Sequence, residues 1–260
     1  MASMRYDDEA ADRLEAVYRG PDIVAQRRHT LDLLALRPGE RVLDIGSGPG
    51  FLCQEMAEAV GPNGRVRGID LSPAFVRRAV ARNGHAWVEY SEGDATSLDG
   101  PDAAWDVIVS VQVAEYVPDI AAFCAEAFRV LRPGGRGVIV ATDWDTMAWH
   151  SDELDRMRRL LEAFRPHCAD SALPRTLRPR LRNAGFEVDR VSCFPIVNTD
   201  WAEGCYSRMM TSFLAAYLRG QTEVPEEEVA AWEAEFPALA AEGRYYFVTT
   251  RIFFEVRRPE

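Results

Sequence analysis

A glycine-rich turn between a short apolar run and a helical run constrains the fold of this chain more than any other feature. Residues 41–45 form an apolar run with the length of a buried parallel strand, and residues 51–60 carry apolar side chains at helical spacing. Gly46, Gly48 and Gly50 lie between the two runs. A strand–turn–helix unit of this kind places its turn at the carboxyl edge of a parallel sheet, where ligands bind.

Strands and helices alternate along the rest of the first half of the chain. The Ser72-Pro73 pair is a typical helix start. Further strands are predicted at 65–70, 87–90, 105–110 and 137–141, and a helix at 120–131. This alternation predicts an α/β fold, in which a Rossmann-like, mostly parallel sheet carries helices on both faces.

The second half of the chain is mainly helical. Helices are predicted at 152–164, 175–184, 201–218 and 225–241, and strands at 186–197 and 245–256. No internal repeat or low-complexity linker divides the 260 residues. The sequence therefore predicts a single domain with helical insertions.

Composition excludes several classes of enzyme and partner. All 30 basic residues are arginines, which excludes a lysine Schiff base, a PLP enzyme, a P-loop NTPase and a Ser-Lys hydrolase. The net charge of −11 disfavours binding to nucleic acid or to an anionic membrane. The chain shows no signal-peptide pattern and no apolar run long enough to cross a membrane, so we expect a cytoplasmic protein. The cysteines and histidines are scattered, and we expect free thiols and no metal site.

Acidic residues follow the predicted strands at their carboxyl ends. The glycine turn does not match the dinucleotide fingerprint G-x-G-x-x-G, because the last position is Phe51. Asp70 ends the second strand 20 residues after Gly50, where a carboxylate can accept both hydroxyl hydrogens of a ribose. Asp94 follows the third strand, where it can accept from an exocyclic adenine amine. Two more motifs occupy 106–119 and 131–135.

Together these five motifs resemble the class I S-adenosylmethionine (SAM)-dependent methyltransferases. The match is to the small-molecule branch (methyltransferase type 11/25, UbiE-like), whose first motif is D-x-G-x-G-x-G, and it covers residues 20–142. The resemblance implies SAM as cofactor, S-adenosylhomocysteine (SAH) as product, and a seven-stranded sheet whose last strand is antiparallel. It divides the single domain, 1–260, into an N-terminal helical lid, a SAM-binding core, a substrate-side region with the sixth strand, and a closing strand, at residues 1–36, 37–142, 143–244 and 245–260.

The resemblance also implies which residues bind the cofactor. Related enzymes often hold the SAM carboxylate with an arginine on the helix before the first strand. Arg28 is the candidate here, ahead of Arg27, although an arginine on that helix could simply face solvent. The implied cofactor-binding residues are Arg28, Asp44, Gly46, Ser47, Gly48, Gly50, Asp70, Leu71, Asp94, Ala95, Ser110 and Val111.

The catalytic candidates lie in segments that follow the fourth and fifth strands. Many relatives carry histidine where this chain has Tyr116, so the role of that histidine cannot be transferred, and Tyr116 is a candidate only by position. Asp143 and His150 are candidate bases in the tryptophan-bearing segment 142–150. The alternative is that His150 caps the next helix and the tryptophans pack in the core.

Two other segments are candidates for the acceptor side of the site. Residues 201–217 carry aromatic and methionine side chains at helical spacing, which is typical of a core as well as of a pocket. Tyr6 and Tyr18 are candidate lid residues over SAM, and disorder is an equal alternative for Tyr6.

Three functions are compatible with these observations. The first is methyl transfer from SAM to an oxygen or nitrogen atom of a small molecule, such as a specialised metabolite. The second is a SAM-dependent cyclase or decarboxylase that keeps the fold without net methyl transfer, and the third is a SAM-binding scaffold. The expected partner is a small-molecule acceptor, without nucleic acid or membrane, and the expected assembly is a monomer or homodimer.

Overall fold

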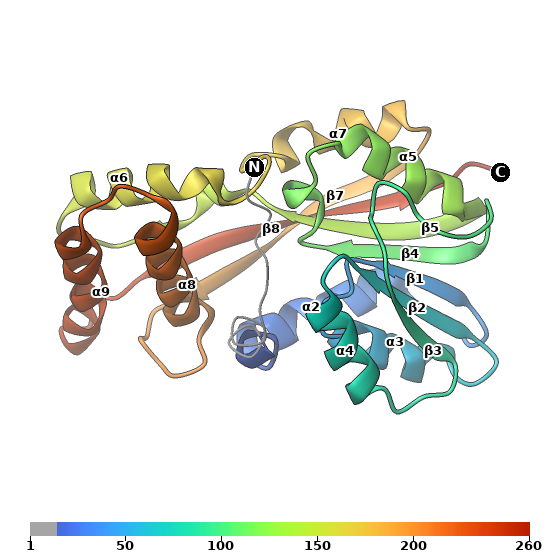
Figure 1. The fold of residues 1–260 in the computed structure, drawn as a ribbon, viewed down its shortest axis with the longest axis horizontal. Helices are drawn as coiled ribbons and strands as arrows, with labels where there is room; N and C mark the ends of the chain where they lie inside the picture. The colour runs from blue at the N-terminus through green and yellow to red at the C-terminus, as the bar shows by residue number, and fades with distance from the viewer. Residues whose placement is uncertain (1–14) are drawn as a thin grey trace.

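The computed structural model describes residues 15–260, and their strands form one mixed sheet. The strand order is β3-β2-β1-β4-β5-β8-β6, and β7 also pairs with β8 (Figure 1). The strands are β1 (Arg41–Ile45), β2 (Arg65–Asp70), β3 (Val88–Glu92), β4 (Trp105–Val111), β5 (Leu131–Thr142), β6 (Ala148–Trp149), β7 (Glu187–Asn198) and β8 (Phe247–Arg257).

Among the described strands, β8 alone runs against the direction of the others. The pairs β1–β2, β1–β4, β2–β3 and β4–β5 are parallel, whereas β5, β6 and β7 each pair antiparallel with β8. This confirms the Rossmann-like, mostly parallel sheet with an antiparallel closing strand. The two-residue strand β6 was not predicted, because a run of two residues carries no periodicity.

Helices cover both faces of the sheet and extend beyond one end of it. They are α2 (Pro21–Leu34), α3 (Phe51–Val60), α4 (Pro73–Arg82), α5 (Ile120–Val130), α6 (Leu154–Phe164), α7 (Pro174–Asn183), α8 (Tyr206–Gln221) and α9 (Glu226–Ala241). In Figure 1, α6, α8 and α9 lie together beyond the start of β8, away from β1, β2 and β3. These three helices form a layer at one end of the sheet, whereas α7 and β7, from the same part of the chain, belong to the sheet and to its core beside α5.

Local chemistry explains where two of these helices begin. Ser72 caps α4 by accepting from the Phe75 amide, as its side chain predicts. The prediction that a helix begins at residue 201 is wrong, because α8 begins at Tyr206. There the Tyr206 amide donates to the carboxylate of Asp22 on α2 at 2.8 Å, so a residue remote in sequence caps this helix.

The core consists of three clusters of buried apolar side chains. One lies between the sheet and α5 and α7, and a second lies on the opposite face beneath α3. The third joins α6, α8 and α9 to the 144–149 segment around Trp232 and Phe236, both of which are fully buried. Burial of two such aromatic side chains gives this helical layer a core of its own.

Candidate functional site

The turn after β1 is fastened to the end of the neighbouring strand β2. The amides of Gly46 and Ser47 both donate to the Ile69 carbonyl at 2.8 Å, and the Gly48 amide donates to the Asp70 carboxylate at 2.8 Å. These bonds hold the loop across the carboxyl ends of two parallel strands. The backbone of the loop is thereby fixed at the edge where ligands bind in such sheets.

Gly46 is the position in this loop that most strictly requires glycine. Its φ is +82°, in the left-handed region, and a Cβ there would overlap the side chain of Val113. At Gly48 a Cβ would meet the Tyr18 hydroxyl at 3.2 Å, the movable end of a side chain. Substitution at Gly46 therefore conflicts with both backbone and packing, whereas at Gly48 the main penalty is the positive φ.

Asp70 is the connection between the loop and the next helix. One of its carboxylate oxygens accepts from Gly48 and the other from the Ser72 amide, each at 2.8 Å. Burial raises the pKa of Asp70, and the two backbone hydrogen bonds act in the opposite direction. Leu71 follows with 69% of its side chain exposed, which leaves an apolar surface uncovered beside the loop.

Asp44 is buried in β1 and points away from solvent. Its carboxylate accepts from the Cys53 thiol at 3.3 Å. Burial raises the pKa of Asp44 to about 7, and the hydrogen bond from Cys53 opposes the shift. Cys53 lies in the first turn of α3, so the Asp44 carboxylate joins β1 to the helix that follows the glycine loop.

The loop after β3 and the end of β4 complete this edge of the sheet. Asp94 is exposed, and its carboxylate accepts from the Thr96 amide and hydroxyl at 2.8 and 2.7 Å, with Ala95 between them. Ser110 is buried and donates to the Ile45 carbonyl at 2.9 Å, which ties β4 to β1, while Val111 is half-buried. The structure thus brings the glycine loop and the ends of β2 and β4 together, as the motif order predicts.

The structure orients α2 so that Arg27, rather than Arg28, faces the glycine loop. Arg27 is 8% exposed, and it forms an ion pair with Glu55 at 2.8 Å and a cation–π contact with Phe51 at the start of α3. It also donates to the Tyr18 carbonyl at 2.6 Å. Arg28 is exposed on the other side of the helix. The sequence analysis ranked the two arginines in the opposite order, because helical phase relative to a partner is not encoded locally.

Tyr18 lies over the glycine loop, as a lid residue would. Its ring stacks on Phe51 with centroids 5.8 Å apart. A Cβ at Gly48 would meet the Tyr18 hydroxyl before any other atom, so this hydroxyl lies next to the loop. Arg82 also connects the N-terminal segment to the glycine loop, because it forms an ion pair with Glu15 at 2.6 Å and donates to the Pro49 carbonyl. Tyr6, the other lid candidate, lies outside the described residues.

A buried arginine near the ends of β4 and β5 was missed by the sequence analysis. Arg251 on β8 is 0% exposed, and it donates to Gln26 at 3.0 Å and to the hydroxyls of Thr142 and Tyr206. With its amide oxygen facing the guanidinium, Gln112 accepts from Arg251 at 2.9 Å. No described carboxylate lies within ion-pair distance of this guanidinium, so neutral oxygens hold a buried positive charge.

Gln112 and Glu115 extend this polar group along the segment after β4. Gln112 has a φ of +57°, a region that residues other than glycine rarely adopt. Glu115 is 0% exposed, and one of its carboxylate oxygens accepts from the Thr142 amide at 3.1 Å. Burial raises the pKa of Glu115 to about 7, and its hydrogen bonds and the charge of Arg251 oppose the shift.

The three catalytic candidates occupy different places. Asp143 is 7% exposed and forms a bidentate ion pair with Arg175 at 2.8 and 2.9 Å. His150 contacts Arg244 and Asp152 near the start of β8. Tyr116 lies in the short helix after β4, at the carboxyl edge of the sheet.

The register of β8 separates His150 from the end of β5. Thr142 is opposite Arg251, whereas Trp149, next to His150, is opposite Phe247. Phe247 and Arg251 are four positions apart, and four residue steps along an extended strand span about 13 Å. The structure therefore does not bring His150 together with the glycine loop and the end of β4.

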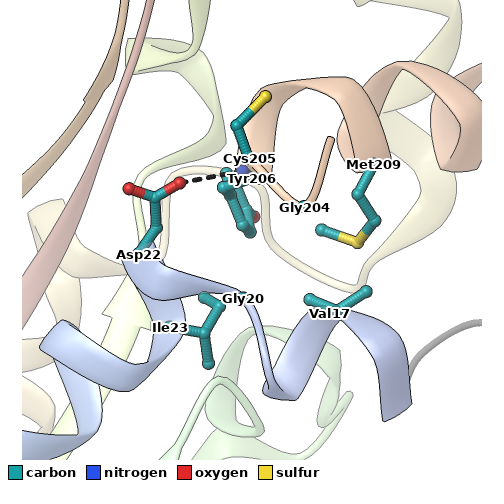
Figure 2. Close-up of a pocket in the computed structure, with 8 residues that line it drawn as sticks. All are labelled: Val17, Gly20, Asp22, Ile23, Gly204, Cys205, Tyr206 and Met209. Atoms are coloured by element: carbon teal, nitrogen blue, oxygen red, sulfur yellow. Dashed lines mark hydrogen bonds between the residues drawn. The ribbon is translucent and has the colours of Figure 1, made fainter. Parts of the chain in front are cut away.

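Two cavities lie near the helical layer. The one in Figure 2 is about 10 Å³ and lies between the start of α2 and the start of α8, and the Asp22–Tyr206 hydrogen bond joins two of the residues that line it. That volume holds about one water molecule. The other is about 220 Å³ and lies between Trp144 and Met147 on one side and Leu161 and Phe164 of α6 on the other. Only the larger cavity has the size of part of a small-molecule acceptor.

Within residues 15–260, no helix is both long and apolar enough to cross a bilayer. The same residues contain no group of three or more His, Cys, Asp or Glu side chains arranged to hold a metal ion.

Comparison with known proteins identifies the family. Residues 42–135 match the family model described as a methyltransferase domain. The ubiquinone/menaquinone biosynthesis C-methyltransferase UbiE of Vibrio campbellii is 31% identical over 184 residues, which are 62% of this chain and 70% of that protein. The chain belongs to the class I SAM-dependent methyltransferases. SAM is the cofactor of this family.

Other similarities extend over less of the relative or at lower identity. The chain is 37% identical to the arsenite methyltransferase of Halobacterium salinarum over 132 residues, which are 50% of this chain and 34% of that protein. It spans about half or less of the length of the most similar curated relatives. A structure of Haemonchus contortus phosphoethanolamine N-methyltransferase 2 with SAM superposes with a TM-score of 0.63 at 17% identity, over 99% of this chain and 58% of that chain. At that identity the superposition supports the fold.

Proposed function

We propose that this methyltransferase transfers the methyl group of SAM to an oxygen or nitrogen atom of a small-molecule acceptor by in-line displacement. The observation that supports this most directly is the glycine loop held by Asp70, beside the exposed side chain of Leu71. Relatives named as an arsenite methyltransferase and a nocamycin O-methyltransferase support a small acceptor. The negative net charge of the chain agrees with an acceptor other than nucleic acid.

The residues at the carboxyl edge fit SAM by their chemistry. Each carboxylate oxygen of Asp70 accepts one backbone amide and keeps a further lone pair for a ribose hydroxyl. Leu71 offers apolar surface for the adenine, and we propose that Asp94 and the Ala95 backbone bind the adenine amine. Bound SAM supplies a methyl group activated by a sulfonium. Alignment of the acceptor with that methyl can contribute about 7–11 kcal/mol to catalysis.

The acceptor side is best placed between the segments that follow β4 and β5, around Tyr116 and Trp144. Asp143 is less suited to act as a base than to hold this segment in position, because Arg175 occupies both of its carboxylate oxygens. His150 is the weaker candidate, because the β8 register separates its neighbour Trp149 from the end of β5 by about 13 Å.

Methyl transfer is tested by measuring SAH release. Purified protein is mixed with SAM and a panel of hydroxyl- and amine-bearing small molecules, and binding of SAM alone is measured by titration calorimetry. We expect SAM binding, and SAH release that depends on the acceptor. Absence of SAM binding would contradict the proposal. Conversion of an acceptor without SAH release would instead support the cyclase or decarboxylase alternative.

Replacement of Arg27 by alanine is expected to weaken SAM binding about tenfold, whereas replacement of the adjacent Arg28 leaves it unchanged. Arg27 holds the Tyr18 carbonyl and packs on Phe51, so its loss frees the lid and the first turn of α3. A charge-assisted hydrogen bond of this kind contributes about 1.5–3 kcal/mol, and 1.4 kcal/mol is tenfold in affinity. Calorimetry on both variants checks this, and a greater loss in Arg28→Ala would restore the original ranking of the two arginines.

A further inference from the structure

His167 is a buried histidine in the helical layer that the mechanism above does not use. It lies in the short helix after α6 (Arg165–His167) and is 5% exposed. Its ring stacks on Phe164 with centroids 3.8 Å apart and an interplanar angle of 10°. Its Nδ1 lies 2.9 Å from the Phe164 carbonyl oxygen. A carbonyl oxygen only accepts, so Nδ1 carries the hydrogen and the tautomer is fixed.

The other ring nitrogen, Nε2, is an acceptor that no residue of the described range 15–260 satisfies. Nε2 of His167 is buried and has no hydrogen bond to any described residue. Burial lowers the pKa of His167 to about 4, and the bond to Phe164 opposes the shift, so the ring is neutral at pH 7. A buried acceptor left unpaired costs about 1–3 kcal/mol, which is a reason to expect a polar ligand there.

His167 packs against the segments that follow β4 and β5, between which the acceptor is expected to bind. Its ring makes edge contacts with Trp144 after β5 and with Tyr116 after β4, at centroid distances of 4.7 and 5.9 Å. Just beyond it, the amide of Ala169 donates to the Glu115 carbonyl at 2.9 Å. The His167 ring is therefore packed against both segments between which the acceptor is expected.

An orphaned donor lies beside the orphaned acceptor. Nε1 of Trp144 is also buried without a hydrogen bond to a described residue, and the Trp144 ring contacts the His167 ring directly. A hydroxyl group both donates and accepts, so it can satisfy an imidazole nitrogen and an indole N–H together. A neutral amine has a single lone pair. If that lone pair accepted a hydrogen bond from the indole N–H, the amine could not use it to attack the methyl group.

We propose that His167 is a catalytic residue that accepts, through Nε2, the proton of a hydroxyl group on the acceptor, so that the methyl group is transferred to oxygen. This inference rests on the proposed methyltransferase function. The acceptor O–H bond breaks toward Nε2, and the oxygen lone pair forms the new bond to the methyl carbon. The carbon–sulfur bond breaks with its electron pair going to sulfur, which leaves neutral SAH, a methyl ether or ester, and an imidazolium that later releases its proton to solvent.

The charge balance of this step suits a histidine of low basicity. One positive charge is present before the step, on the sulfonium, and one after it, on the imidazolium, so the buried site does not gain net charge. The positive sulfonium disfavours protonation of a nearby imidazole, and that penalty disappears as the methyl group leaves. Since His167 is almost fully buried, the inference requires one of the surrounding aromatic side chains to change rotamer when the acceptor binds.

Phenol and its methyl ether, anisole, test the binding part of this inference. Protein labelled with ¹⁵N in its imidazole rings is saturated with SAH and titrated with each probe. We expect phenol to shift the Nε2 resonance of His167 while anisole, which has no hydrogen to donate, leaves it in place. His167→Phe assigns the resonance. No shift with phenol, or an equal shift with both probes, would overturn the inference.

Kinetics of the variants test the proton transfer. His167→Gln places an amide oxygen near the position of Nε2, so it can accept a hydrogen bond but not a proton. With any hydroxylic acceptor that supports SAH release, we expect kcat to fall by about 10²–10⁴-fold while KM and SAM affinity stay within about threefold. The matched control is His85→Gln, since His85 lies before β3 at the opposite edge of the sheet.

The two levels of the proposal fail in different ways. If the wild type binds SAM and releases SAH but His167→Gln keeps its kcat, the role of His167 is refuted and methyl transfer stands. Release of SAH with amines alone also refutes it. If the wild type does not bind SAM, the methyltransferase function itself is refuted, while the phenol titration of the free protein still decides whether Nε2 receives a hydroxyl group.

Discussion

Replacement of Asp70 by alanine is expected to weaken SAM binding by at least about 100-fold. Asp70 holds the Gly48 amide with one oxygen and the Ser72 amide with the other, so the variant loses the support of the loop and of the α4 N-terminus. It also loses the carboxylate proposed to bind the ribose. Each charge-assisted hydrogen bond to a ribose hydroxyl contributes about 1.5–3 kcal/mol to SAM binding. Loss of two such bonds raises the Kd for SAM by a factor of about 100 or more.

Asparagine at the same position sharpens the test. Both backbone partners of Asp70 are donors, and an amide has one oxygen and one NH₂ group, so Asp70→Asn must set a donor against a donor at one of the two contacts. We therefore expect Asp70→Asn to bind SAM more weakly than the wild type and better than Asp70→Ala. Asp155→Ala, which removes a largely exposed carboxylate on α6, is the control. Wild-type SAM affinity in Asp70→Ala, measured by calorimetry, would contradict the assignment of the SAM site.

Replacement of Arg251 by methionine is expected to lower the free energy of unfolding by about 3–5 kcal/mol. The guanidinium joins Gln26 on α2, Thr142 at the end of β5 and Tyr206 at the start of α8. Methionine fills a similar volume but leaves those oxygens without their donor and leaves the buried Glu115 without its nearest positive charge. A loss of this size is a large fraction of the 5–15 kcal/mol that stabilises a typical domain.

Lysine separates the contribution of charge from that of geometry at this position. Arg251→Lys keeps the positive charge, but a single ammonium cannot reach three acceptors on three different elements. We expect it to recover part of the lost stability, with a midpoint of urea denaturation between those of the wild type and Arg251→Met. Arg158→Met, at a 76% exposed side chain, controls for the loss of a surface arginine. A midpoint for Arg251→Met equal to that of the wild type would show that the buried charge does not stabilise the fold.

Local sequence determined the first two strands and the glycine loop between β1 and α3. The runs at 41–45 and 65–70 became β1 and β2 with unchanged bounds, because an apolar run between turn residues has few other places in an α/β fold. Gly46 and Asp70 could be singled out for the same reason. A strand–turn–helix unit fixes its own geometry within a few residues, and parallel pairing then aligns the ends of neighbouring strands.

Tertiary structure alone decided the acceptor side. Nothing in the local sequence distinguishes Arg251 from an exposed arginine on a strand. Its charge is buried among neutral oxygens because β8 pairs with β5 beneath α2 and α8. His167 follows a helix in the middle of an insertion, and its distance from Trp144 depends on how that insertion folds back. The choice between Arg27 and Arg28 depends on the rotation of α2 about its axis. Such contacts join segments tens to more than two hundred residues apart, and long-range packing of this kind leaves no periodic trace in the sequence.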